Sequence, residues 1–173
     1  MFEKLNIILP DLDIHRLKDD GAQLDQRYPS NFKEYEIKDQ NYLRSLFEFD
    51  LGWDDANITV FKSGGGKLPH TDSWSTALNY YIAAEQATTT FYANPTGHKI
   101  AYEALPGLDM YNLNQLIPVA EFYAVSGDCY LVNTKIPHNV TDKYTGSRIL
   151  LRLVWYNEPY QSVLDKIRRC YGW

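Results

Sequence analysis

A long series of short β-type stretches is the feature that most limits what this chain can fold into. Between residues 57 and 155 these stretches are rich in valine, isoleucine, threonine and aromatic residues, which favour an extended backbone. Turn-forming residues, such as those at 94–97 and 127–128, separate them. The expected strands are residues 57–61, 75–83, 88–92, 121–125, 129–132, 136–140 and 148–155. This pattern predicts a mainly β fold, either a β-sandwich or a jelly roll.

Helical patterns flank the β region on both sides. Asp39 is a candidate N-cap for a helix over residues 39–48, and Pro159 opens a second helix with apolar residues at i, i+3, i+4 and i+7. The N-terminal segment is expected to pack outside the β core. We therefore interpret the chain as one domain, 1–173, with an N-terminal flanking segment (1–57), a jelly-roll core (58–156) and a C-terminal helix (157–173).

Length and charge narrow the class of protein further. A chain of 173 residues is long enough for one domain with a real core. Its net charge of −5 and lack of a basic run argue against a nucleic-acid partner. No apolar stretch approaches the ~18 residues of a membrane span, and no leader is visible at the N-terminus. With two cysteines, the chain does not suggest a disulfide framework, so we expect a cytoplasmic protein.

Two histidines and one carboxylate form the most informative group of polar residues. His70 and Asp72 stand two positions apart, so both side chains point to the same side of an extended segment. His138 comes far downstream, at the start of another expected strand. Two imidazoles and one carboxylate suit a non-haem Fe(II) centre with open coordination positions. The alternative is a surface aspartate beside a half-buried histidine.

Two arginines lie on the last expected strand. Alternation places Arg148 and Arg152 on one face with Leu150, while the other face is apolar. An arginine is costly to bury without an anionic partner, and its guanidinium fork suits a carboxylate. Ligand binding by at least one of them is one interpretation, and a solvent-exposed face is the other.

Taken in order, His70-Thr71-Asp72, His138 and Arg148 resemble the Fe(II)- and 2-oxoglutarate-dependent oxygenases, whose core is a double-stranded β-helix (jelly roll). The residues at 125–131 and 146–148 are similar to that family as well, and the resemblance covers residues 58–156. Prolyl-hydroxylase-like members keep all three ligands, whereas aspartyl/asparaginyl-hydroxylase-like members sometimes lack the carboxylate. Because Asp72 is present, the resemblance does not extend to halogenating members, which replace it with a small residue.

The resemblance implies specific roles for individual residues. His70, Asp72 and His138 would hold Fe(II), and Arg148 would bind the distal carboxylate of the cosubstrate 2-oxoglutarate. The remaining cofactor-binding candidates are Tyr81 and Asn79, for which core packing is the alternative, and Arg152, which is similar to a second arginine that some members direct into the site. Candidates for contact with the substrate are Trp74, with core packing as the alternative, and His98, which could instead be an exposed loop histidine.

The implied reaction is hydroxylation of a substrate with O2, coupled to oxidative decarboxylation of 2-oxoglutarate to succinate and CO2. A peptide side chain or a small metabolite is the expected substrate, and the irregular stretch 98–119 and the glycine turn at 64–66 are expected to help recognise it. Two other classes stay open. One is a cupin-like metal enzyme that does not use 2-oxoglutarate, and the other is a non-catalytic carbohydrate-binding β-sandwich.

Overall fold

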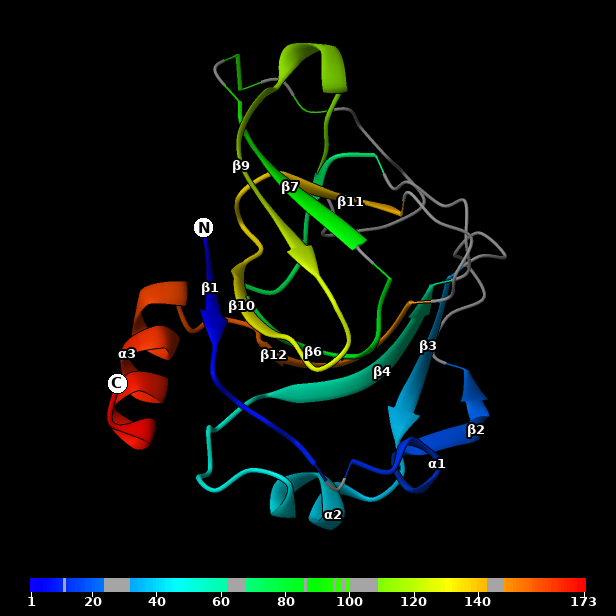
Figure 1. Cartoon of the computed structure of the whole chain (residues 1–173). Helices are drawn as coiled ribbons and strands as arrows, with labels where there is room; N and C mark the ends of the chain where they lie inside the picture. The colour runs from blue at the N-terminus through cyan, green and yellow to red at the C-terminus, as the bar shows by residue number, and fades with distance from the viewer. Residues whose placement is uncertain are drawn as a thin grey trace.

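The computed structural model describes residues 1–10, 12–23, 32–61, 68–85, 87–94, 96–97, 99, 109–142 and 148–173. His98, the glycine turn at 64–66 and part of the 98–119 stretch lie outside the described residues. The described chain is mainly β (Figure 1), as the sequence predicts. Its strands are β1 (Phe2–Leu5), β2 (Lys18–Gln23), β3 (Phe32–Ile37), β4 (Asp55–Phe61), β5 (His70–Thr71), β6 (Thr76–Ala83), β7 (Ala87–Ala93), β8 (Asp109–Met110), β9 (Ile117–Ala124), β10 (Cys129–Asn133), β11 (His138–Asp142) and β12 (Arg148–Trp155).

Two antiparallel sheets face each other within the described part of the chain. Sheet A has the order β1-β10-β6-β12-β4-β3-β2, and sheet B has the order β8-β5-β11-β7-β9. The chain passes between the sheets so that β12 lies between β4 and β6, and β11 lies between β5 and β7. In both sheets, a strand from the end of the chain, β11 or β12, thus lies between two strands that come earlier in the sequence. This interleaving defines a double-stranded β-helix, so the predicted jelly roll is confirmed.

Two apolar clusters hold this architecture together. One lies between the sheets and is built around aromatic rings, with Phe122 stacked on Tyr130 at a centroid distance of 4.0 Å. The other lies on the outer face of sheet A, under the helices that pack there (Figure 1). Strand β12 serves both, because Leu150 belongs to the inner cluster and Leu151 to the outer one. Because successive side chains point to opposite faces of the sheet, β12 contributes residues to both clusters.

Helices α1 (Ile14–Leu17), α2 (Gln40–Ser45) and α3 (Tyr160–Tyr171) cover sheet A. The 3-10 helix η1 (Leu113–Gln115) lies elsewhere, beside sheet B and directly before β9 (Figure 1). Asp39 caps α2 by accepting a hydrogen bond from the Tyr42 amide, as predicted. Helix α3 begins after Pro159 and buries Val163, Leu164 and Ile167. None of the helices among the described residues has the length and apolar character needed to cross a membrane.

The N-terminal segment differs from the sequence prediction. Instead of packing outside the β structure, it supplies three strands of sheet A: β1 pairs with β10 at one end, and β3 and β2 extend the sheet beyond β4. The ring of Phe2 enters the space between the sheets, 4.8 Å from the Phe122 ring and 5.3 Å from the Phe91 ring. Burial of this ring explains the placement, since β10 would otherwise be an exposed edge.

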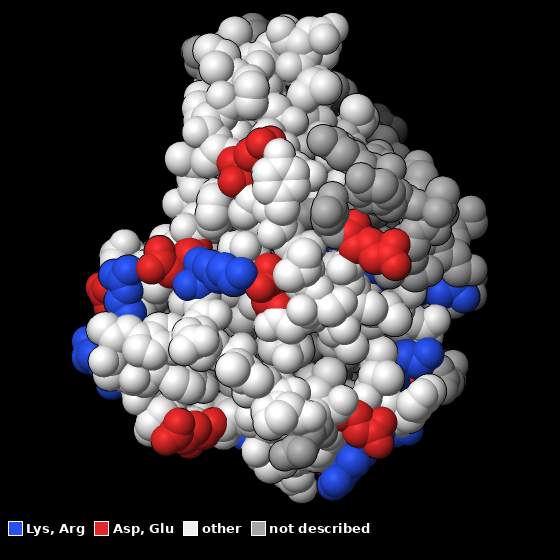
Figure 2. Space-filling model, viewed as in Figure 1, with Lys and Arg blue, Asp and Glu red and all other residues white. Residues whose placement is uncertain are grey.

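Surface charge is unevenly distributed on the face seen in Figure 2. Lysine and arginine side chains lie among aspartate and glutamate side chains at the level of sheet A, whereas the part over β7 and β9 shows one acidic patch and no blue side chains. The exposed residues of β9 include Ile117, Val119 and Tyr123, on an edge strand of sheet B. Opposite charges on this face are thus intermixed around sheet A.

We predict that Phe2→Ala destabilises the protein although it changes only the second residue. The ring is partly buried, so its removal should cost about 2 kcal/mol, less than the truncation of a fully buried phenylalanine. Urea unfolding measures this free energy. Ile8→Ala is the control, because Ile8 is 71% exposed and its truncation should change stability by less than about 0.5 kcal/mol. Equal effects of the two substitutions would contradict the placement of β1.

Candidate metal centre

His70, Asp72 and His138 come together at one end of the space between the sheets. His70 is the first residue of β5 and His138 is the first residue of β11, and the two are direct partners in the antiparallel pair. Asp72 follows β5 immediately, in the connection to β6. Residues that face each other across an antiparallel pair point to the same side of the sheet, so both imidazoles face the interior.

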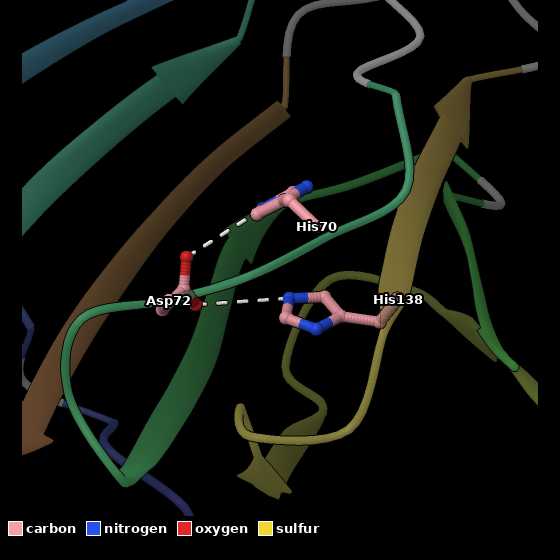
Figure 3. A group of neighbouring side chains, drawn as sticks. All are labelled: His70, Asp72 and His138. Atoms are coloured by element: carbon pink, nitrogen blue, oxygen red, sulfur yellow. Dashed lines mark ion pairs between the residues drawn. The ribbon is translucent and has the colours of Figure 1, made fainter. Parts of the chain in front are cut away.

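The three side chains are close enough to share one ion. In Figure 3 the carboxylate of Asp72 lies between the two imidazoles, with its oxygens 3.5 Å from His70 Nε2 and 3.7 Å from His138 Nε2. One ligand atom from each residue lies within 4.8 Å of the others. The imidazole centroids are 4.7 Å apart, and both histidines are buried. Among the described residues, this is the group of three that could hold a metal ion.

Backbone carbonyls orient both imidazoles in the same way. His70 Nδ1 lies 2.9 Å from the carbonyl oxygen of Leu68, and His138 Nδ1 lies 2.9 Å from that of Ile136. A carbonyl oxygen only accepts hydrogen bonds, so a neutral imidazole donates from Nδ1 and leaves the lone pair on Nε2. Both Nε2 atoms face the carboxylate. Hydrogen bonds from Nδ1 to the main chain fix the orientation of each ring, as is usual for histidines that bind a metal through Nε2.

The protonation states also suit metal binding. Burial lowers the pKa of His138 to about 4, so its imidazole is neutral at pH 7. Burial alone would raise the pKa of Asp72, but its pairing with His70 and the positive charge of Arg152 help to lower it below the usual range. His138 therefore offers a neutral nitrogen and Asp72 an ionised oxygen, the forms that bind a divalent metal.

The three residues line a cavity between the sheets. It encloses about 530 Å³, including its open mouth. Predicted cofactor residues from sheet A share its wall: Arg148, Tyr81, Asn79 and Arg152. The structure thus brings these predicted residues to the same cavity as the three candidate ligands.

Arg148 is the buried cation of this cavity. It is 3% exposed, and its guanidinium lies 3.8 Å from the centroid of the Phe61 ring on the neighbouring strand. Tyr81 is 2% exposed and lies close enough to Arg148 to feel its charge, although burial is the dominant effect and raises the pKa of Tyr81. The Tyr81 side chain also hydrogen-bonds Thr89. The guanidinium of Arg148 and the phenol of Tyr81 thus lie on the same wall of the cavity.

Arg152 has protein partners within the same cavity. Its Nε donates to Asn79 Oδ1 at 3.2 Å, and its Nη1 lies 3.4 Å from Glu34 Oε1 on β3. Trp74 does not line the cavity; its ring lies against the Arg152 guanidinium at a centroid distance of 5.5 Å. Arg152 therefore links β3 to β12, and its charge is balanced by Glu34. The sequence does not identify Glu34, which is 118 residues from Arg152.

Thr134 is a further cavity residue that the sequence does not single out. It is 2% exposed, lines the cavity and lies in the turn between β10 and β11. Its carbonyl and hydroxyl both bond to the segment that carries Asp72. No local pattern marks this threonine, because its partners lie about 60 residues away in the chain.

Comparisons with known proteins yield matches among solved structures alone. No protein-family model and no curated protein matches the sequence. A structure of Bacillus subtilis oxalate decarboxylase described for its Mn(II) centres has a TM-score of 0.46 and 14% identity, covering 79% of this chain and 28% of that chain. A mutant of the same enzyme gives a TM-score of 0.45 and 15% identity, over 76% and 27%. The chain thus spans little more than a quarter of these proteins, and its fold is assigned from its own strand order.

Fold and cavity together define a jelly-roll protein with a candidate metal centre of two histidines and one aspartate. Bound there, a metal would be held on one side by the protein, and its other positions would face the cavity. Such a centre can bind and polarise a small anionic ligand, and Arg148 lies on the wall of the same cavity.

We predict that the purified chain binds one Mn(II) or Fe(II) and that His138→Ala abolishes this binding. Loss of one of three ligands should weaken affinity at least 100-fold. Anaerobic titration followed by calorimetry measures the affinity. His15→Ala is the matched control, because His15 lies in α1 and belongs to no such group. Equal binding by His138→Ala and wild type would exclude this site.

We predict that the metal-free protein loses stability as the pH falls from 7 to 4.5, in part through His138. The unfolded chain binds a proton at His138 near the ordinary pKa of 6.5, whereas the folded chain does so only near 4. The unfolded state therefore holds more protons in this window, and acid favours it, by about 2 kcal/mol for this group. Urea unfolding at both pH values should show a smaller loss in His138→Gln than in wild type.

Proposed function

We propose that this protein is a 2-oxoglutarate-dependent oxygenase that uses Fe(II) held by His70, Asp72 and His138. The observation that carries the proposal is the buried Arg148 in the same cavity as the three candidate ligands. A metal with open positions can be chelated by the keto-acid end of 2-oxoglutarate, and a guanidinium can bind the carboxylate at the other end. Fe(II) would supply O2 activation when bound, and the protein residues would bind and position the cosubstrate.

The charge of the metal centre supports an anionic cosubstrate. A divalent metal beside the ionised Asp72 carboxylate would keep a net positive charge in a buried site. Buried charge is costly unless it is paired, and the keto-acid end of 2-oxoglutarate would bring a carboxylate to the metal. The cosubstrate would thus reduce the charge of the metal centre.

The remaining cavity residues have positioning roles in this proposal. The Tyr81 hydroxyl would donate a hydrogen bond to a carboxylate held by Arg148, because the raised pKa of Tyr81 keeps the hydroxyl protonated. The aromatic rings of the inner cluster would keep bulk water away from the reacting atoms, because they fill the space behind His138, whose ring lies 5.8 Å from that of Phe91. Asn79 and Arg152 line the side of the cavity where Trp74 packs.

The reaction would be hydroxylation of a peptide side chain or a small metabolite, with release of succinate and CO2. The net charge of −5 fits such a substrate better than a nucleic acid. Substrate, cosubstrate and O2 are the partners that this function requires.

The test is anaerobic addition of Fe(II) and then 2-oxoglutarate to the apo-protein, with visible absorption recorded. We predict a weak charge-transfer band in wild type and at least a tenfold loss of 2-oxoglutarate affinity in Arg148→Ala, because the distal carboxylate loses its cation. Arg169→Ala is the matched control, because Arg169 is exposed on α3 and does not line the cavity, so the affinity of this variant for 2-oxoglutarate should stay within about threefold of wild type. Equal losses in Arg169→Ala and Arg148→Ala would contradict the role of Arg148.

A metal enzyme of the same fold that does not use 2-oxoglutarate is the second candidate. The grouping of His70, Asp72 and His138 is the observation that raises it, because these three side chains could hold a metal without any cosubstrate. Such an enzyme would not need Arg148 to bind a second carboxylate. Binding of Mn(II) with no affinity for 2-oxoglutarate, in wild type and Arg148→Ala alike, would favour this candidate over the oxygenase.

A further inference from the structure

Of the three candidate ligands, Asp72 is the one that the strand pairing of the sheets does not hold in place. His70 and His138 lie in the ladder between β5 and β11, but β5 contains just two residues, and Asp72 lies beyond its end. The partners of its carboxylate among the described residues are the two histidines, which are themselves candidate ligands. The main chain around Asp72 is therefore what must fix the position of the carboxylate.

A turn on the other side of the cavity mouth holds that main chain. The Asp72 amide donates to the carbonyl of Thr134 at 3.1 Å. The Thr134 hydroxyl donates to the carbonyl of Trp74 at 2.7 Å. Lys135 Nζ donates to the carbonyl of Asp72 at 3.2 Å and to that of Ser73 at 2.9 Å. Two consecutive residues thus bind main-chain groups of all three residues from 72 to 74.

The turn that provides these bonds is fixed at both of its ends. The Asn133 side chain accepts a hydrogen bond from the Lys135 amide at 3.1 Å, and the Asn133 amide donates to the carbonyl of Met1. Four residues beyond Thr134, His138 begins β11. The same turn therefore leads into the ligand His138 and binds the segment that carries the ligand Asp72.

We propose that Thr134 and Lys135 are positioning residues that hold Asp72 at the metal by its main chain. They form a clamp, by which we mean the four hydrogen bonds from these two residues to residues 72–74. A clamp of this kind reduces the freedom that Asp72 would lose on binding a metal, so it raises metal affinity without touching the ion. The inference rests on the metal centre of the proposed function.

Lys135 gives the clearest test because its side chain is exposed, so its loss should not disturb the core. Lys135→Met keeps the length of the side chain and removes the ammonium donor. Lys38→Met is the matched control, because Lys38 is also exposed and its side chain has no hydrogen-bond partner recorded among the described residues. Thr134→Val removes the hydroxyl donor at nearly constant shape, and Thr134→Ser restores it.

The experiment measures Mn(II) affinity by the EPR signal of free Mn(II), and thermal unfolding of each variant without metal. Lys135→Met and Thr134→Val should each weaken Mn(II) binding about tenfold, while Lys38→Met and Thr134→Ser stay within about twofold of wild type. Lys135→Met should unfold without metal at the same temperature as Lys38→Met, because its effect lies in the bound site. A purely structural lysine would instead lower that temperature and leave the Mn(II) affinity unchanged.

Two results would overturn the inference, and they differ from each other. If wild type binds Mn(II) and both Lys135→Met and Thr134→Val bind it equally well, the clamp does not position Asp72, but the metal centre stands. If wild type does not bind Mn(II) at all, both the metal centre and the clamp are excluded.

Discussion

The pairing of His70 with His138 across β5 and β11 is the contact on which the candidate site depends. It is the single pair of residues that joins these strands, yet it brings together histidines that are 68 positions apart. Because side chains alternate between the faces of a strand, a shift of either strand by one residue would turn its histidine out of the cavity. The register of this one pair therefore decides whether two imidazoles can face one ion. Asn139 and Thr71, the next residues along, cannot replace them.

The rest of sheet B keeps that register in place. Strand β11 pairs over its full length with β7, and β7 pairs with β9, so His138 is fixed by a ladder much longer than the one it shares with His70. His70 is supported from its other side by Met110 of β8. The two ligands are thus positioned by different means: one by an extended sheet, the other by short pairings on both sides. Asp72 lies beyond both and needs the turn at Thr134.

Much of this could be predicted from the sequence because the signals are local. Alternation on β12, the Asp39 cap and the spacing of His70 and Asp72 each act over a few residues, so the pattern contains the information. The place of β1 and the partner of Arg152 depend on contacts between distant segments. Glu34 and Phe2 carry no local mark of their roles, since what defines them is the strand that each one meets.

Burial explains why the cavity wall and the outer core can share one strand. On β12 the outward residues pack under the helices, which makes the strand rigid, while the inward residues include two arginines. Arg148 lies over Phe61 and Arg152 is held by Asn79 and Glu34, so each guanidinium has a defined place before any ligand arrives. Fixed charges on a rigid strand need little reorganisation when an anion binds. The apolar outer core therefore helps to fix the positions of the two guanidinium groups on the inner wall.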